Sequence, residues 1–199
     1  MATLHRLGEP GVERLEAQLR NFVQDMPIAL VLPCHISEIG TAALRGILRE
    51  LEEVDYLQQV VVGIDGATPG EWRKARQFFA KSRHKPVLLW NDGPRMKRLI
   101  RKLAAADLDP GQRGKGRNMW LCYGYVLAAG QARVIAAHDC DILTYGRELL
   151  ARLCYPVAND SLGFDFCKGY TARFTHKLNG RVMRLMFTPL IRSLESIIG

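Results

Sequence analysis

Two aspartates one residue apart, Asp139 and Asp141, are the clearest indication of chemistry in this sequence. They directly follow His138 and a short apolar run, 134–137, which is typical of a buried strand. Hard cations such as Mg²⁺ and Mn²⁺ take oxygen ligands, and one or two carboxylates often complete a coordination sphere otherwise made by waters and phosphate oxygens. The pair therefore indicates a divalent-metal site. A surface turn or a helix cap is the alternative, because Asp-x-Asp is common by chance.

A lysine flanked by two glycines, Gly114-Lys115-Gly116, is the second candidate. Glycines allow backbone amides and the ammonium group to approach a phosphate closely, which bulkier side chains would prevent. A helix expected at 118–129 would add the amides of its first turn to an anion site. A flexible basic loop with no ligand is the alternative.

An alternation of strands and helices would position these residues. Short apolar runs at 28–32, 60–64, 87–90 and 134–137 predict buried strands. Helical spacing of apolar residues follows the first strand, with Ser37 as the expected N-cap, and a capping box at 68–71 opens the next helix. The sequence therefore predicts an α/β fold, with a mostly parallel sheet flanked by helices.

Such sheets bind ligands at the carboxyl ends of their strands. The residues to consider are then Pro33-Cys34-His35 and Glu38 after the first strand, Asp65-Gly66 after the second, Asn91-Asp92 after the third and the two aspartates after the fourth. We predict a leader helix within residues 1–27, since apolar residues share one helical face over 12–23. No low-complexity linker follows, so residues 28–199 are expected to form a single domain.

Charge and composition narrow the class of function. The chain has a formal net charge of +8, and its basic residues are concentrated at 95–117, with eight Lys or Arg against two Asp, and at 163–199, with six against two. This distribution favours a bound anion over a uniformly basic surface. Aromatic residues are not interleaved with the basic ones, so nucleic acid is not the expected partner.

No apolar stretch is long enough to cross a membrane, and the five cysteines form no C-x-x-C pair, so we expect a cytoplasmic protein with reduced thiols.

Two common nucleotide-binding signatures are absent. The sequence has neither G-x-x-x-x-G-K-[ST] nor a G-x-G-x-x-G after its first strand, which disfavours a P-loop hydrolase and an ordinary dinucleotide enzyme.

The ordered set of motifs resembles the glucosyl-3-phosphoglycerate synthase family of retaining GT-A glycosyltransferases. The resemblance begins with Pro33 to Glu38, Asp65, the GKG loop before Met119-Trp120, and the Asp-x-Asp pair. It continues with Lys168-Gly169-Tyr170 and Arg173, then Asn179-Gly180-Arg181-Val182 before Thr188-Pro189-Leu190. It covers roughly residues 28–190.

The resemblance implies a function and a role for each matching residue. The chain would be a metal-dependent hexosyltransferase that moves glucose or mannose from an NDP-sugar to a small phosphorylated acid such as 3-phosphoglycerate, with Mg²⁺ or Mn²⁺ as cofactor. The donor would be a UDP- or GDP-hexose. The catalytic residues would be Asp141, as direct metal ligand, and Lys115, on the diphosphate. The residues that bind the nucleotide sugar would be Pro33, Cys34, Glu38, Asp65, Gly114, Lys115 and Asp139, with Asp139 on the ribose or the metal. The acceptor would be bound by Gly180, Arg181 and Met183.

The family continues well beyond the position of Gly199, so the chain is expected to lack its C-terminal region, and a homodimer stays open. Two alternatives remain from the residues alone: a sugar-phosphate nucleotidyltransferase, although the first loop lacks the glycine-rich pattern of that class, and a non-catalytic nucleotide-sugar-binding fragment.

Overall fold

The structure is a computed structural model that describes residues 11–169, 186 and 188–198. The chain separates into two compact units, which are considered individually. One unit is Pro10–Cys167; the other combines Met1–Glu9 with Lys168–Gly199 and contains helix α7, Thr188–Ile198.

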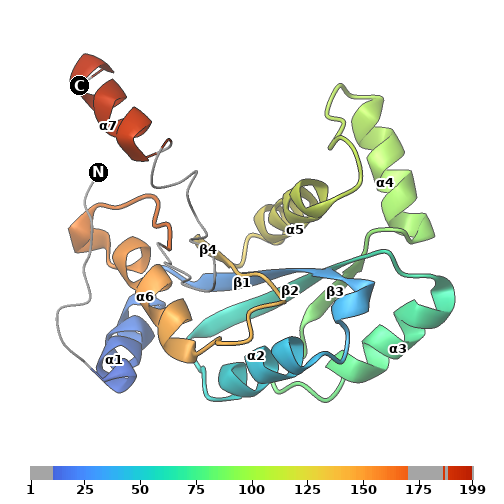
Figure 1. Ribbon diagram of the computed structural model, residues 1–199, viewed down its shortest axis with the longest axis horizontal. Helices are drawn as coiled ribbons and strands as arrows, with labels where there is room; N and C mark the ends of the chain where they lie inside the picture. The colour runs from blue at the N-terminus through green and yellow to red at the C-terminus, as the bar shows by residue number, and fades with distance from the viewer. Residues whose placement is uncertain (1–10, 170–185, 187, 199) are drawn as a thin grey trace. The chain divides into compact units, whose positions relative to one another are not determined.

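A four-stranded parallel sheet lies at the centre of the larger unit (Figure 1). Its strands are β1 (Ile28–His35), β2 (Leu57–Asp65), β3 (Val87–Trp90) and β4 (Val134–Ala137), in the order β3-β2-β1-β4. Every neighbouring pair is parallel. Since β1 lies in the middle, the residues that follow it lie between those that follow β2 and β4. The predicted α/β class is confirmed.

Helices cover both faces of this sheet. They are α1 (Val12–Phe22), α2 (Ala42–Glu52), α3 (Pro69–Phe79), α4 (Pro94–Ala104), α5 (Lys115–Ala129) and α6 (Arg147–Ala158), with short 3₁₀ helices η1 (Ile36–Glu38) and η2 (Asp160–Leu162). In Figure 1, α2 and α3 lie on one side of the sheet and α5 on the other.

Alternate residues of β1 pack into two separate cores. Leu30 and Leu32 belong to the larger one, which includes side chains of α2, α3 and α6. Ala29 and Val31 face α5, where they pack with Cys122 and Val126. This two-sided burial explains why the strand is a continuous apolar run, because neither face meets water.

Strand β1 is longer than predicted, because Pro33 does not end it. The strand continues through Pro33 to His35, with Pro33 opposite Gly63 of β2. Val31 is the last residue of β1 paired with β4, and its carbonyl accepts a hydrogen bond from the His138 amide at 3.1 Å. The backbone groups of residues two apart in a strand point to the same side. A backbone N–H at position 33 would therefore point, like the Val31 carbonyl, toward β4, which has already ended at this level. The proline therefore costs no ladder hydrogen bond.

The expected N-cap at Ser37 is wrong. Helix α2 begins after Thr41, whose hydroxyl accepts from the Leu44 amide at 3.3 Å. Ser37 lies inside η1, where His35 and Glu38 form a capping box. Helix α5 also begins earlier than expected, at Lys115, but ends as predicted before Gly130 in the left-handed conformation. The predicted capping box of α3, between Thr68 and Glu71, is present.

The leader helix α1 packs beside α6. The rings of Phe22 and Tyr155 meet edge to face with centroids 5.6 Å apart. Glu16, only 2% exposed, lies 3.7 Å from the Arg147 guanidinium, which also reaches the Glu13 carboxylate at 3.1 Å. An acidic side chain is therefore enclosed between the two helices.

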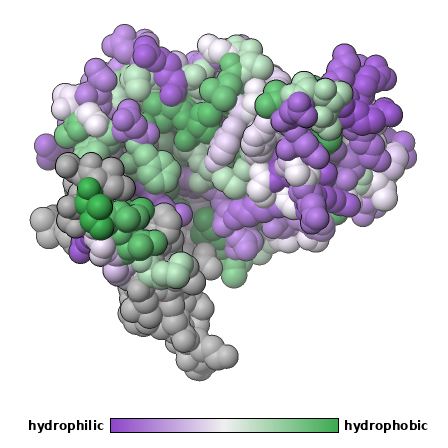
Figure 2. Space-filling model, turned by 90° about the horizontal axis from the view of Figure 1, so that it is seen from above, coloured by the Kyte–Doolittle hydropathy of each residue, from purple (hydrophilic) through white to green (hydrophobic). Residues whose placement is uncertain are grey.

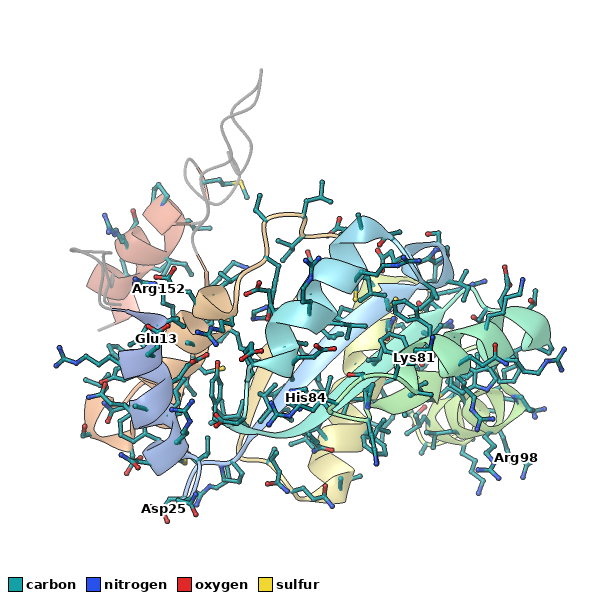
Figure 3. All side chains as sticks on the ribbon, turned by 90° about the horizontal axis from the view of Figure 1, so that it is seen from below. Glu13, Asp25, Lys81, His84, Arg98 and Arg152 are labelled. Atoms are coloured by element: carbon teal, nitrogen blue, oxygen red, sulfur yellow. The ribbon has the colours of Figure 1, made fainter. Side chains whose placement is uncertain are left out.

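Helix α4 is strongly basic and contributes no buried residue to the core. Its Lys and Arg side chains are exposed, and Arg98 projects outward in Figure 3. The same end of the larger unit, at the right of Figure 2, has a mainly hydrophilic surface. Within the described part of the chain, no helix has the length and apolar character needed to cross a membrane.

Candidate active site at the carboxyl ends of the strands

A pocket of about 400 Å³ opens where β1, β2 and β4 end and α5 begins. Its lining includes every nucleotide- or metal-binding residue predicted from the sequence that the structure describes: Pro33, Cys34, Glu38, Asp65, Gly114, Lys115, Asp139 and Asp141. The predicted acceptor residues Gly180, Arg181 and Met183 lie outside the described residues. Segments more than 100 residues apart thus meet at one edge of the sheet.

The first wall of the pocket is the turn that follows β1. The His35 amide donates to the Glu38 carboxylate at 2.9 Å, and the Ser37 amide donates to His35 Nδ1 at 3.3 Å. This local capping holds the Glu38 carboxylate in place before any ligand arrives. Contact with the Cys140 thiol, together with burial, raises the pKa of the Cys34 thiol, so this sulfur is protonated in the ligand-free site.

Asp65 forms the second wall, at the end of β2. It is 5% exposed, and its carboxylate accepts from the Asn91 side-chain amide at 2.8 Å. The chain then turns at Gly66, which has φ +85° and donates its amide to Asp92 at 2.6 Å. A Cβ on Gly66 would lie 2.6 Å from the His35 ring, so this turn requires glycine.

The close approach of α5 to β2 positions the GKG loop. A Cβ on Gly63 would lie 1.8 Å from Asn118 Oδ1 and 2.5 Å from Cys122 Sγ, so the helix packs against bare backbone. The Asn118 amide donates to the Gly63 carbonyl at 2.9 Å. Gly114, with φ 154°, caps the helix and places Lys115 in its first turn. The Lys115 ammonium forms an ion pair with Asp139 across the pocket.

The charge of the lining favours a cation. Four carboxylates line the pocket (Glu38, Asp65, Asp139, Asp141) against the cationic side chains of Arg113 and Lys115. Asp139 is paired with Lys115, whereas Asp141 is exposed and makes no ion pair or side-chain hydrogen bond within the described residues. An oxygen donor in an electronegative pocket is the donor type that Mg²⁺ or Mn²⁺ takes, so the residues present fit such an ion.

The predicted site set leaves out four lining residues: His35, Arg113, Asn118 and Cys140. Of these, His35 is among the strand-end residues considered from the sequence. Arg113 directly precedes the GKG loop and reaches the Asp92 carboxylate at 3.4 Å, so its position beside that loop was a usable signal. No local pattern could identify Asn118, because its partner Gly63 lies 55 residues away. His138, beside the Asp-x-Asp pair, is buried against Tyr145, and burial lowers its pKa to about 4, so it stays neutral.

This chain has relatives among curated proteins and solved structures. The chain is 43% identical over 199 residues to the glucosyl-3-phosphoglycerate synthase of Persephonella marina, a match that covers 100% of this chain and 49% of that protein. It is 32% identical over 188 residues to the enzyme of the same name from Methanococcoides burtonii, covering 92% of this chain and 46% of that protein. The chain thus spans about half the length of these relatives. No family model matches it.

A solved glucosyl-3-phosphoglycerate synthase from Mycobacterium tuberculosis, in complex with Mn²⁺, UDP and phosphoglyceric acid, has a similar fold. The TM-score is 0.53 at 20% sequence identity, with 98% of this chain and 56% of that chain covered. That likeness shows the fold alone. The curated matches, which extend over nearly the whole chain, relate it to the glucosyl-3-phosphoglycerate synthases, as a stretch that corresponds to about half the length of one.

Proposed function

We propose that this chain is the donor-binding part of a metal-dependent retaining glycosyltransferase, which moves a hexose from an NDP-sugar to a small phosphorylated acid such as 3-phosphoglycerate. The observation that supports this proposal most strongly is the pocket at the carboxyl ends of the strands. It gathers the residues that the family resemblance assigns to the nucleotide sugar, from three strand ends and one helix start. The names of the relatives favour glucose as the hexose.

A nucleoside diphosphate would place further negative charge beside four carboxylates. Coulomb repulsion between like charges a few ångströms apart opposes such binding. A divalent cation held by Asp141, with Asp139 beside it, would offset the excess of acidic groups in the lining and would neutralise charge on the departing diphosphate. The metal requirement thus follows from the composition of the lining.

Lys115 and the start of α5 would bind the diphosphate from the opposite side. The Lys115 side chain is 57% exposed, so a phosphate can reach it without burying a charge. The first-turn amides of α5 would add hydrogen-bond donors that have no intrahelical partner. Lys115 now contacts Asp139, so donor binding would exchange this carboxylate for a phosphate.

The remaining lining residues would bind the nucleoside. Pro33 and Cys34 near the end of β1, Glu38 in η1 and Asp65 at the end of β2 line the same pocket as the proposed metal ligands. For the acceptor we propose Gly180, Arg181 and Met183, since an arginine offers a planar fork for a carboxylate or phosphate. The acceptor hydroxyl would attack from the sugar face that the diphosphate leaves, which retains the anomeric configuration.

Asp141→Asn tests the metal-dependent part of this proposal. The substitution preserves size but removes the carboxylate charge. We expect the parent chain to bind UDP much more tightly with Mn²⁺ than without it, and the variant to lose most of that difference. Isothermal titration calorimetry with and without Mn²⁺ measures it, and needs no turnover by a chain that spans half of its relatives.

Asp160→Asn is the matched control, because Asp160 is an exposed aspartate in η2 that does not line the pocket. It should leave metal-dependent UDP affinity unchanged. Equal metal dependence in the parent and in Asp141→Asn would contradict the proposal.

Arg181→Ala tests the acceptor assignment. We expect a loss of 3-phosphoglycerate affinity of about tenfold or more, corresponding to a charge-assisted hydrogen bond, with nucleotide affinity nearly unchanged. Arg192→Ala, at an exposed position on α7, is the control. A matched loss of both ligands in Arg181→Ala would show that donor and acceptor residues are not separate.

A further inference from the structure

Two cysteines and a glutamate meet on one wall of the pocket. The Sγ atoms of Cys34 and Cys140 and a carboxylate oxygen of Glu38 all lie within 4.8 Å of one another. Cys34 and Cys140 are 0% and 1% exposed, and all three residues line the pocket. The cluster therefore presents two sulfurs and one oxygen as ligands for a small cation that enters the pocket.

The fold itself brings these groups together. Cys34 is near the end of β1, and Glu38 is in η1, four residues further on. Cys140 follows β4, the strand that pairs with β1. The Glu38 carboxylate is held by the His35 amide, so it needs little reorganisation to serve as a ligand. Within the described residues, no other group of three metal-ligating side chains reaches this spacing.

The donor set differs in kind from that of Asp139 and Asp141. Thiolates are soft ligands that select Zn²⁺ and similar cations, whereas carboxylates alone suit Mg²⁺ and Mn²⁺. Zinc bonds of about 2.3 Å to sulfur and 2.0–2.2 Å to oxygen place neighbouring tetrahedral ligands about 3.5–3.8 Å apart. The cluster has to contract by no more than about 1.3 Å to reach that geometry.

We propose that Cys34, Glu38 and Cys140 form a site for a thiophilic divalent cation such as Zn²⁺ or Cd²⁺, separate from the hard-cation site at the Asp-x-Asp pair. Each thiol releases its proton to the solvent as its sulfur binds the cation, and water from the pocket completes the coordination sphere. Since the same pocket wall is assigned to the nucleoside, a cation held there would lower donor affinity. This last consequence rests on the proposed function, but cation binding itself does not.

Titration with Cd²⁺ tests the site directly, because cadmium–thiolate bonds produce a charge-transfer absorption band in the ultraviolet. The metal-free chain is kept reduced with a phosphine that does not bind the metal strongly. We expect one Cd²⁺ per chain with this band, and displacement of Cd²⁺ by added Zn²⁺. Cys34→Ala and Cys140→Ala should each weaken the band and lower Cd²⁺ affinity by about tenfold or more. Glu38→Gln should keep the band and lower the affinity.

Three controls separate this site from other ligands. Cys154→Ala removes a thiol buried to the same degree on α6, Cys167→Ala removes a more accessible one, and Asp141→Asn disables the hard-cation site. All three should keep the band and the affinity. Cd²⁺ binding without the band, a band that survives both Cys34→Ala and Cys140→Ala, or a band lost in Asp141→Asn would each overturn the proposal. Circular dichroism confirms that each variant is folded. Loss of UDP binding with an intact cadmium band would contradict the proposed function alone.

Discussion

At the scale of single residues, Asn118 couples the pocket to the core. It is 2% exposed and donates to a backbone carbonyl of the neighbouring strand, while its helix begins at the lysine of the GKG loop. One amide group therefore stabilises the fold and also fixes the angle at which that loop meets the strand ends.

We expect Asn118→Ala to lower the free energy of unfolding by about 1–3 kcal/mol, because a buried hydrogen bond between α5 and β2 is lost. Urea denaturation followed by circular dichroism measures this. Asn21→Ala is the matched control on the exposed face of α1, and should change stability by no more than about 0.5 kcal/mol. Equal stability of the two variants would mean that water replaces the lost donor.

At the scale of elements, the α1–α6 contact contains the enclosed Glu16 carboxyl. Burial raises the pKa of this group above its ordinary value, in opposition to the nearby Arg147 and Arg20 charges. Between the ordinary and the raised pKa, the folded chain holds a proton that the unfolded chain has released. The free energy of unfolding therefore falls as the pH rises through this interval.

We expect Glu16→Gln to remove this part of the pH dependence, because a glutamine has no proton to lose. Parent and variant should differ most above the raised pKa, and the difference should shrink toward low pH, where both side chains are neutral. Urea denaturation across pH 4–8 is the measurement. Arg147 keeps its contact with Glu13 in the variant, so the contact between α1 and α6 retains an ion pair. Parallel pH profiles would contradict the assignment of the slope to Glu16.

Elements defined by local patterns were predictable from the sequence. Strands β3 and β4 and the capping box of α3 lie where the sequence predicts them, since apolar runs and capping residues act within a few positions. The continuation of β1 past Pro33 was not predictable, because it depends on pairing with β2 and on the end of β4 opposite Val31, about 100 residues later in the chain. The strand-end rule predicts that Asp65 and the two aspartates lie close together, and the structure places them in one pocket. No such rule applies to Asn118, which lies within a helix.

At the scale of the whole molecule, two sources of charge act on an anionic ligand. One is the general positive charge of the chain, +8, much of it on exposed α4. The other is the pocket, whose own lining has more acidic than basic side chains. General charge attracts any polyanion and is screened by salt, whereas selective binding of a nucleotide needs the pocket.

The double variant Lys97→Glu with Arg101→Glu separates these effects. Both residues are exposed on α4 and neither lines the pocket. We expect earlier elution from a heparin column, because four units of positive charge are removed from the surface. The Mn²⁺-dependent affinity for UDP at physiological ionic strength should change by less than about twofold, given a Debye length of about 8 Å. A loss of UDP affinity as large as that in Asp141→Asn would instead place α4 in the nucleotide site.

The absence of a side chain at position 63 limits how this sequence can change over evolutionary time. A methyl group there would overlap α5, the helix that begins in the GKG loop of the proposed phosphate site, so even alanine cannot be accommodated unless α5 moves away. Homologues can exchange most apolar residues of the sheet for others of similar volume. At this position a saturation library selected for nucleotide binding should return glycine, so the smallest residue in the strand is also the least replaceable.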